Sequence, residues 1–170
     1  MTYSPKPQNL KPLLITIILS AISVFCFVFP GRFPKFIWLF QLSFICTATA
    51  AIQILIKYVL TKFEYNCDDD SLYIYKSLGK RKLLIGKLEL SSSASYMTEE
   101  KQFIESGNNY NIKSRYIYTR NYKTPNVYVY ITTIGETNFM IKIEANAEFA
   151  EYVNNKIDNC LKGYKEYDEV

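Results

Sequence analysis

The chain has 170 residues, a net charge of +4 and no histidine, so it is long enough for a small domain but lacks the side chain most used for proton transfer. No acidic residue precedes Glu64, and all sixteen follow from there, so the basic excess lies outside the part that could fold as a nucleic-acid-binding domain. Only Cys67 and Cys160 lie outside the apolar segments, which excludes a structural zinc site of the usual kind. There is no histidine to activate a nucleophile and no glycine-rich phosphate loop, so we expect a protein that is not an enzyme and binds no cofactor, metal or nucleic acid.

The N-terminal third predicts a tail and a membrane hairpin. Residues 1–12 are polar, contain three prolines and predict a disordered tail. Residues 13–60 predict a transmembrane helical hairpin, with spans at 13–29 and 37–58 and a Pro-Gly turn between them. The end of the first span and the turn after it, FVFPGRFPK, contain no small-residue cleavage motif, so we expect the span to be retained rather than removed as a signal peptide.

Small residues recur every four positions along one face of the second span, at Ser43, Thr47 and Ala51. Such a face allows another helix to approach closely. It predicts packing against the first span, through Ser20 and Ser23, or alternatively an interface between copies of the chain.

The flanking charges predict the orientation in the membrane. Four lysines lie on the side of the two termini, and two basic residues lie in the turn between the spans. Because basic residues are enriched in cytoplasmic segments, we expect a two-pass protein of the cell membrane with both termini in the cytoplasm. The residues compared are Lys6, Lys11, Lys57 and Lys62 against Arg32 and Lys35.

From residue 61 the hydrophobic period changes from that of a helix to that of a strand. Residues 61–162 predict an α+β domain: an antiparallel bent sheet or open barrel of about seven strands, followed by one amphipathic helix at about 147–161. We expect residues 97–112 to form a surface loop and 163–170 a polar tail. Cys67 and Cys160 could form a disulfide, but a cytoplasmic location favours free thiols.

The segment KFEYNCDDDSLYIYKSLGKRKLLIGKLELS, at 62–91, contains a strand, an acidic turn, a strand ending in a basic residue, a Gly-Lys-Arg turn and a third strand. Together with the two preceding spans and the terminal helix, it resembles small bacterial membrane proteins with a pleckstrin-homology-like (PH-like) domain. The resemblance implies a membrane-anchored binding or scaffolding domain without catalytic residues.

Four basic residues surround the second of these turns: Lys76, Lys80, Arg81 and Lys82. In phosphoinositide-binding members of the pleckstrin-homology group, basic residues near an early hairpin bind phosphates, so this cluster predicts contact with lipid headgroups. A solvated turn is the alternative interpretation. The three adjacent carboxylates at 68–70 lack the spacing of a calcium loop and predict only a turn.

Two functions are consistent with these patterns. The first is a non-catalytic binding or scaffolding module, anchored at the inner leaflet, that recognises a protein partner or lipid headgroups. The alternative is an accessory subunit of a membrane transport or secretion complex, in which the helices recognise the partner.

Overall fold

The computed structural model describes residues 1–7, 10–29, 31, 34–68, 70–90, 96–106, 111–121, 126–134 and 137–167. The chain forms two compact units, which are described separately below. One is a helical unit, Pro7–Thr61. The other, here called the aqueous unit, contains Met1–Lys6 and Lys62–Val170, so the chain leaves it after Lys6 and returns to it at Lys62.

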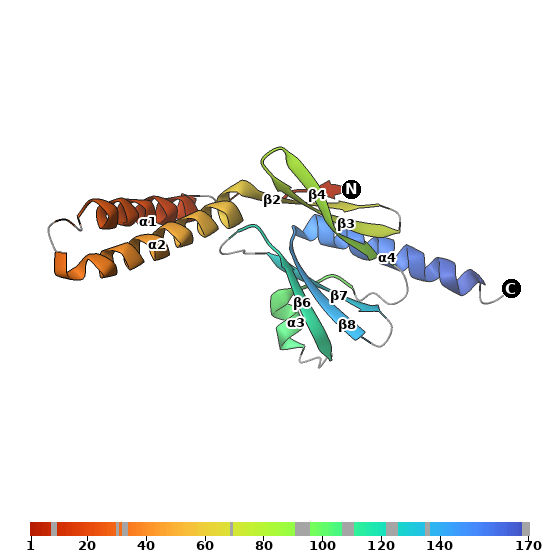
Figure 1. The fold of residues 1–170 in the computed structure, drawn as a ribbon. Coiled ribbons are helices and arrows are strands. Elements are labelled where there is room, and N and C mark those ends of the chain that lie inside the picture. Colours follow the sequence, from red (N-terminus) through yellow and green to blue (C-terminus); the bar gives the residue numbers. More distant parts are fainter. Residues whose placement is uncertain are drawn as a thin grey trace. The chain divides into compact units, whose positions relative to one another are not determined.

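The helical unit consists of α1 (Leu10–Val28), a short 3-10 helix (η2, Pro34–Phe36) and α2 (Ile37–Ile54), which continues as a π-helix (η3, Leu55–Leu60) (Figure 1). Two segments, Leu10–Val28 and Pro34–Leu60, are long and apolar enough to cross a membrane. Their outer faces are apolar and exposed, as at Phe27 and Ile45. The two predicted spans are therefore present as helices, and the first begins three residues earlier than predicted.

The aqueous unit contains two sheets of four strands in the described residues. The first sheet has the order β1 (Thr2–Tyr3), β2 (Thr61–Cys67), β3 (Ser71–Leu78) and β4 (Arg81–Glu89). The second has the order β5 (Thr98–Glu99), β7 (Val127–Ile134), β8 (Thr137–Glu144) and β6 (Ile112–Tyr118). A short helix, α3 (Glu100–Glu105), and the long C-terminal helix, α4 (Ala147–Tyr167), complete the unit (Figure 1).

The predicted α+β class and C-terminal helix are confirmed, but the prediction that all strands pair antiparallel, in a bent sheet or open barrel, is wrong. The strands divide between two sheets, and β6 pairs with β8 in parallel, with Tyr116 opposite Ile141. The difference lies in which strand β6 pairs with. β7 and β8 form an antiparallel hairpin, and β6 pairs in parallel with the other edge of β8 instead of with β7, the strand that follows it in the sequence.

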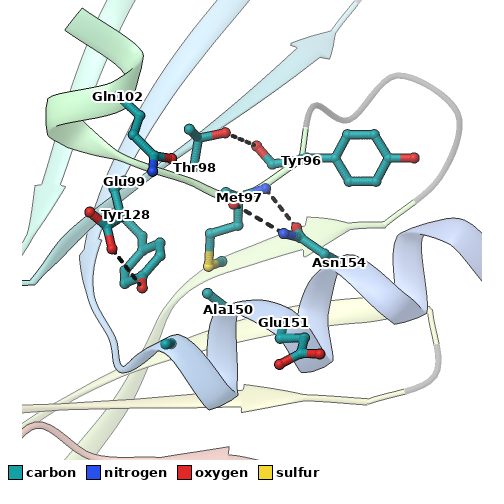
Figure 2. Close-up of a pocket in the computed structure, with 10 residues that line it drawn as sticks. Tyr96, Met97, Thr98, Glu99, Gln102, Tyr128, Ala150, Glu151 and Asn154 are labelled. Atoms are coloured by element: carbon teal, nitrogen blue, oxygen red, sulfur yellow. Dashed lines mark hydrogen bonds between the residues drawn. The ribbon is translucent and has the colours of Figure 1, made fainter. Parts of the chain in front are cut away.

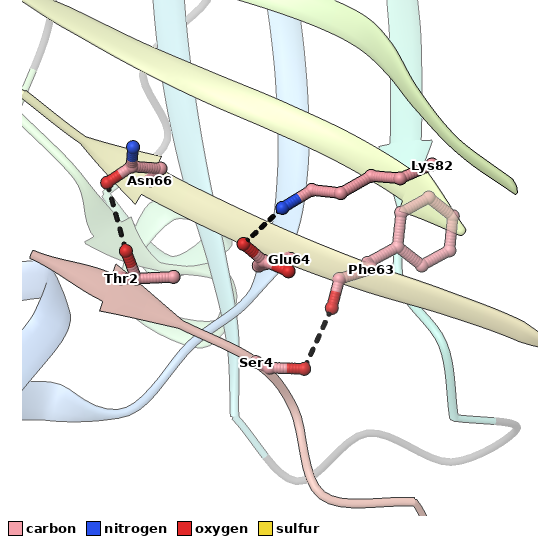
Figure 3. Close-up of polar contacts among 6 residues, drawn as sticks. All are labelled: Thr2, Ser4, Phe63, Glu64, Asn66 and Lys82. Atoms are coloured by element: carbon pink, nitrogen blue, oxygen red, sulfur yellow. Dashed lines mark hydrogen bonds and ion pairs between the residues drawn. The ribbon is translucent and has the colours of Figure 1, made fainter. Parts of the chain in front are cut away.

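The prediction of a disordered tail at 1–12 is also wrong. Thr2 and Tyr3 form a strand that pairs antiparallel with β2, opposite Asn66 and Tyr65. The Thr2 hydroxyl donates a hydrogen bond to the side-chain oxygen of Asn66 (3.1 Å), and the Ser4 hydroxyl donates one to the carbonyl of residue 63 (3.1 Å) (Figure 3).

Aromatic packing explains why this polar segment is ordered. The Tyr3 ring stacks on Tyr65, with 6.4 Å between the ring centroids, and tilts against Phe149 of α4 at 5.5 Å. Such aromatic pairs contribute about 0.5–1.5 kcal/mol beyond the area they bury. Long-range packing therefore overrides the composition of the segment.

Two further predictions require correction. Residues 97–112 are not simply a loop, because they include β5, α3 and the start of β6. The backbone of α4 continues to Tyr167, so most of the predicted tail at 163–170 is helical. Gly163 does not end the helix, since an internal glycine costs only about 1 kcal/mol relative to alanine.

The core lies between the sheets and α4. Phe149, Val153 and Ile157 are fully buried and recur at the helical spacing that the sequence predicted. They pack with buried side chains of β2, β3, β7 and β8, among them Tyr65 and Tyr130. The same cluster contains Cys67, and burial raises the pKa of its thiol to about 11. All four cysteines are free, as predicted for Cys67 and Cys160.

A buried polar cluster joins the end of β8 to the N-terminal segment. The Glu144 side chain, 6% exposed, accepts hydrogen bonds from the backbone N–H groups of Arg120 and Asn121 (both 3.2 Å) and from the side-chain amide of Asn121. That amide also donates to the Lys6 carbonyl (3.0 Å), and the Arg120 guanidinium lies 3.5 Å from the Pro5 carbonyl. Burial lowers the pKa of Arg120, and the nearby Glu144 partly offsets this shift.

Candidate functional site

The β3–β4 hairpin contains the basic residues that the sequence singled out. Gly79 provides the turn, with a φ of 60° that favours glycine over other residues. Four cross-strand pairs then lead from the turn toward the core, from Leu78 opposite Arg81 to Tyr75 opposite Leu84. The register shifts at the next position, between Ile74 and Tyr75.

The end of this hairpin extends beyond the core. Ile74 is completely buried, whereas Leu78, Leu83 and Leu84 are 46%, 62% and 53% exposed. Because neighbouring side chains of a strand point to opposite faces, Leu83 and Leu84 place exposed apolar surface on both faces. We call residues 76–84 the hairpin tip.

All four predicted headgroup residues lie in the hairpin tip and are exposed. Lys82 has partners: its ammonium group lies 2.6 Å from a carboxylate oxygen of Glu64 (Figure 3). It also lies 4.4 Å from the centre of the Tyr75 ring. Lys76, Lys80 and Arg81 have no ion-pair partner in the described part of the chain. These three charges remain available to an anionic ligand.

The tip lies at the end of the first sheet where β2 begins. β2 and β3 are neighbours in this sheet, and only three residues separate Cys67 from Ser71, so the two strands run antiparallel and the end of β3 lies beside the start of β2. In the sequence, β2 follows Leu60 directly, and Leu60 is the last residue of the second apolar helix. The tip therefore lies at the end of the sheet that the chain reaches on leaving this helix.

The sequence did not predict that the leucines of the hairpin tip are exposed, because it indicated ordinary strands with one buried face. Leu83, Leu84 and Ile85 form a run of consecutive apolar residues in a strand whose neighbours alternate. A strand with one face toward a core and one toward water needs apolar residues only at every second position. This run therefore indicated apolar side chains on both faces of the strand, so that at least one of them would contact an apolar environment outside the core or remain exposed.

The predicted helix-packing face lies inside the helix pair. The hydroxyl group of Thr47 in α2 lies 2.7 Å from that of Ser23 in α1, and the two share a hydrogen bond. Thr47 also donates to the Ser43 carbonyl (2.7 Å). Ala51 is only 5% exposed. Ser20, the other predicted partner on α1, is exposed. The face thus serves the contact between α1 and α2.

Replacing Ala51 with leucine is expected to destabilise the helix pair by about 1–3 kcal/mol, because the added atoms have no space between the helices. The measurement is unfolding of the full-length protein in detergent mixtures with rising SDS, followed by the fluorescence of Trp38. Thr49→Leu, on the exposed face of α2, is the matched control and is expected to leave the unfolding midpoint unchanged. Equal midpoints for both variants would contradict this packing.

The acidic turn between β2 and β3 has no observed role beyond the turn. Asp69 lies outside the described residues. On either side of it, the backbone N–H of Asp68 donates to the Ser71 carbonyl, and the N–H of Leu90 donates to the Asp70 carbonyl. No group of three or more acidic, cysteine or histidine residues that could hold a metal ion occurs among the described residues.

The sequence and structure were also compared with known proteins. No family model, no curated protein and no solved structure matches the chain. The hairpin tip is therefore interpreted from its own geometry and charge.

Proposed function

We propose that this protein is a membrane-anchored, non-catalytic binding module of the cell membrane. In this proposal α1 and the continuous α2–η3 helix span the bilayer as a hairpin with both termini in the cytoplasm. The aqueous unit then lies at the inner leaflet as a PH-like domain. Two observations support the anchoring: both helices have exposed apolar faces, and no acidic residue precedes Glu64.

The PH-like assignment rests on the resemblance of residues 62–91 and on the general architecture. Two sheets followed by a C-terminal helix are consistent with it. The parallel pairing of β6 with β8 departs from the all-antiparallel arrangement predicted from the sequence. The domain is therefore proposed as PH-like in its first sheet and terminal helix, with a different second sheet.

The observation that supports the binding role is the exposure of Leu78, Leu83 and Leu84 beside Lys80 and Arg81 at one end of the sheet. Leucines at such a tip enter the boundary between headgroups and acyl chains, and the basic side chains bind anionic headgroups. Each lysine or arginine near an anionic surface contributes about 1 kcal/mol. Because the unit is already tethered, the contact does not require a new association from solution.

Contact of the tip with lipid is tested with a fluorescent label. In full-length protein, the accessible Cys46 and Cys160 are replaced by alanine and a bimane label is attached to Leu83→Cys. The labelled protein is reconstituted in nanodiscs that contain nitroxide-labelled lipid. We expect strong quenching in nanodiscs that contain phosphatidylglycerol. The control label on Glu89→Cys, at the other end of β4, is expected to show little quenching. Equal quenching at both positions would refute the proposed contact.

Reversing the two charges Lys80→Glu and Arg81→Glu is expected to weaken the contact at least about thirtyfold, since the loss of two basic residues corresponds to roughly 2 kcal/mol. The measurement is the quenching of the same label at Leu83→Cys as a function of the fraction of anionic lipid. The matched control reverses Lys101 and Lys113, two exposed lysines on α3 and β6. An equal loss of quenching in this control would show that the net charge of the protein, and not the position of Lys80 and Arg81, governs the contact, and would contradict the proposal.

The alternative, a subunit of a transport or secretion complex, would require a helix face free to bind a partner. The face predicted for that role already holds the hydrogen bond between Thr47 and Ser23. The hairpin tip, in contrast, has exposed apolar and basic groups. We therefore favour the binding module, and crosslinking in intact membranes distinguishes the two by whether a partner attaches at the helices or at the tip.

A further inference from the structure

A second surface of the aqueous unit contains a hollow of about 330 Å³ that is separate from the hairpin tip. One wall is the segment from Tyr96 to Gln102, which includes β5 and the start of α3, and Tyr128 of β7 completes this side. The opposite wall is the first part of α4, at Ala147, Ala150, Glu151 and Asn154 (Figure 2). The volume is at the lower end of the range of about 300–1,000 Å³ for ligand sites, and the hollow is open on one side.

The two walls are held together by specific bonds, so the hollow is preformed. The side-chain amide of Asn154 accepts a hydrogen bond from the backbone N–H of Met97 (2.8 Å) and donates one to its carbonyl (3.1 Å) (Figure 2). The Tyr96 hydroxyl donates to Asp158 of α4 (2.5 Å). On the other side, β5 pairs with β7, with Glu99 opposite Tyr128.

The floor of the hollow is apolar and its walls are acidic. Met97, Ala150 and Tyr128 are 3%, 4% and 6% exposed, and the Met97 side chain points between the walls (Figure 2). Glu99 on the strand side and Glu151 on the helix side are both exposed carboxylates. None of the ten lining residues is a lysine or arginine. An anionic ligand would therefore meet two negative charges and no compensating group.

We propose that this hollow binds a positively charged side chain, arginine or lysine, of a partner protein. The apolar floor suits the aliphatic stem of such a side chain, and its charged end can form charge-assisted hydrogen bonds with the exposed carboxylates of Glu99 and Glu151 at the walls. The Tyr128 ring adds an aromatic surface for a cation. Because the hollow is small and open, it accommodates one projecting side chain of a protein and leaves too little enclosing surface for a larger free ligand.

The three methionines of the chain allow a direct test. Full-length protein labelled with ¹³C at the methionine methyl groups, in nanodiscs, is titrated with the peptide Gly-Arg-Gly. We expect a saturable shift of the Met97 methyl signal and none of Met140, which lies in a different apolar cluster. The citrulline peptide, which has the same shape without the charge, is expected to leave Met97 unshifted.

Replacing the carboxylates identifies the groups that bind. Glu99→Gln with Glu151→Gln is expected to weaken binding of the arginine peptide about tenfold or more, because two charge-assisted bonds are lost. The matched control, Glu148→Gln, is exposed on the same helix outside the hollow and is expected to bind as the unchanged protein does. Equal binding of the citrulline peptide, no Met97 shift up to the solubility of the arginine peptide, or an equal loss in the control would each overturn the proposal. None of these outcomes depends on lipid contact at the hairpin tip.

Discussion

Replacing Glu144 with alanine is expected to lower the free energy of unfolding of the aqueous unit by about 3–5 kcal/mol, the cost of removing one partner from a buried charged network. The substitution leaves the buried backbone N–H groups of Arg120 and Asn121 without their acceptor. It also leaves the Arg120 guanidinium, 4% exposed, without its nearby negative charge. The measurement is urea unfolding of the full-length protein in nanodiscs, followed by tyrosine circular dichroism.

The control for this substitution is Glu105→Ala, which removes an exposed carboxylate at the end of α3. Surface changes of this kind alter stability by no more than about 0.5 kcal/mol. Glu144→Gln keeps the shape of the side chain and one oxygen acceptor, so its free energy of unfolding is expected to lie between those of Glu144→Ala and Glu105→Ala. Equal stability of Glu144→Ala and Glu105→Ala would show that the network contributes nothing to the fold.

Replacing Phe149 with alanine is expected to lower the free energy of unfolding of the aqueous unit by about 3–5 kcal/mol, as truncation of other buried phenylalanines does. Phe149 is completely buried and contacts the rings of Tyr3 and Tyr65, with centroids 5.5 Å and 6.4 Å away. The substitution removes a contact on which the short strand β1 depends. Hydrogen exchange is therefore expected to accelerate at β1 and at its partner residues in β2 before it does in β7 and β8.

Phe149→Leu serves as the control, because it fills most of the same volume and is expected to cost much less than the alanine variant. Both variants are compared by urea unfolding and by hydrogen exchange of the full-length protein. If exchange in β1 is as slow in Phe149→Ala as in the unchanged protein, the aromatic contact does not order the N-terminal strand.

The elements that the sequence predicted well are those with a strong local period. The two apolar helices follow from the length of their apolar runs, and the buried face of α4 follows from spacing, since Phe149, Val153 and Ile157 recur at intervals of four. The predicted basic cluster was also placed correctly on one hairpin, because a single glycine turn connects its two strands.

The features that the sequence did not predict depend on contacts distant in the chain. The pairing of Tyr3 with Tyr65 joins residues about sixty positions apart, and no local pattern indicates it. β6 pairs with β8 and not with β7, the strand that follows it in the sequence, and the period of a strand does not indicate which strand becomes its neighbour. The hollow beside Met97 likewise forms only when α4 meets the segment that follows residue 95.

The pairing of β1 with β2 has a consequence for biogenesis. During synthesis β1 is made first, but its partner follows only after the whole helical unit, Pro7–Thr61. In the proposed two-pass topology the two strands are on the same side of the membrane only after the second helix has returned the chain to the cytoplasm. A chain inserted with one span would leave β1 and β2 on opposite sides, and the first sheet would lack its edge strand. Completion of the first sheet would thus depend on correct insertion, because a misinserted chain would lack the edge strand and the packing of Tyr3 on Phe149.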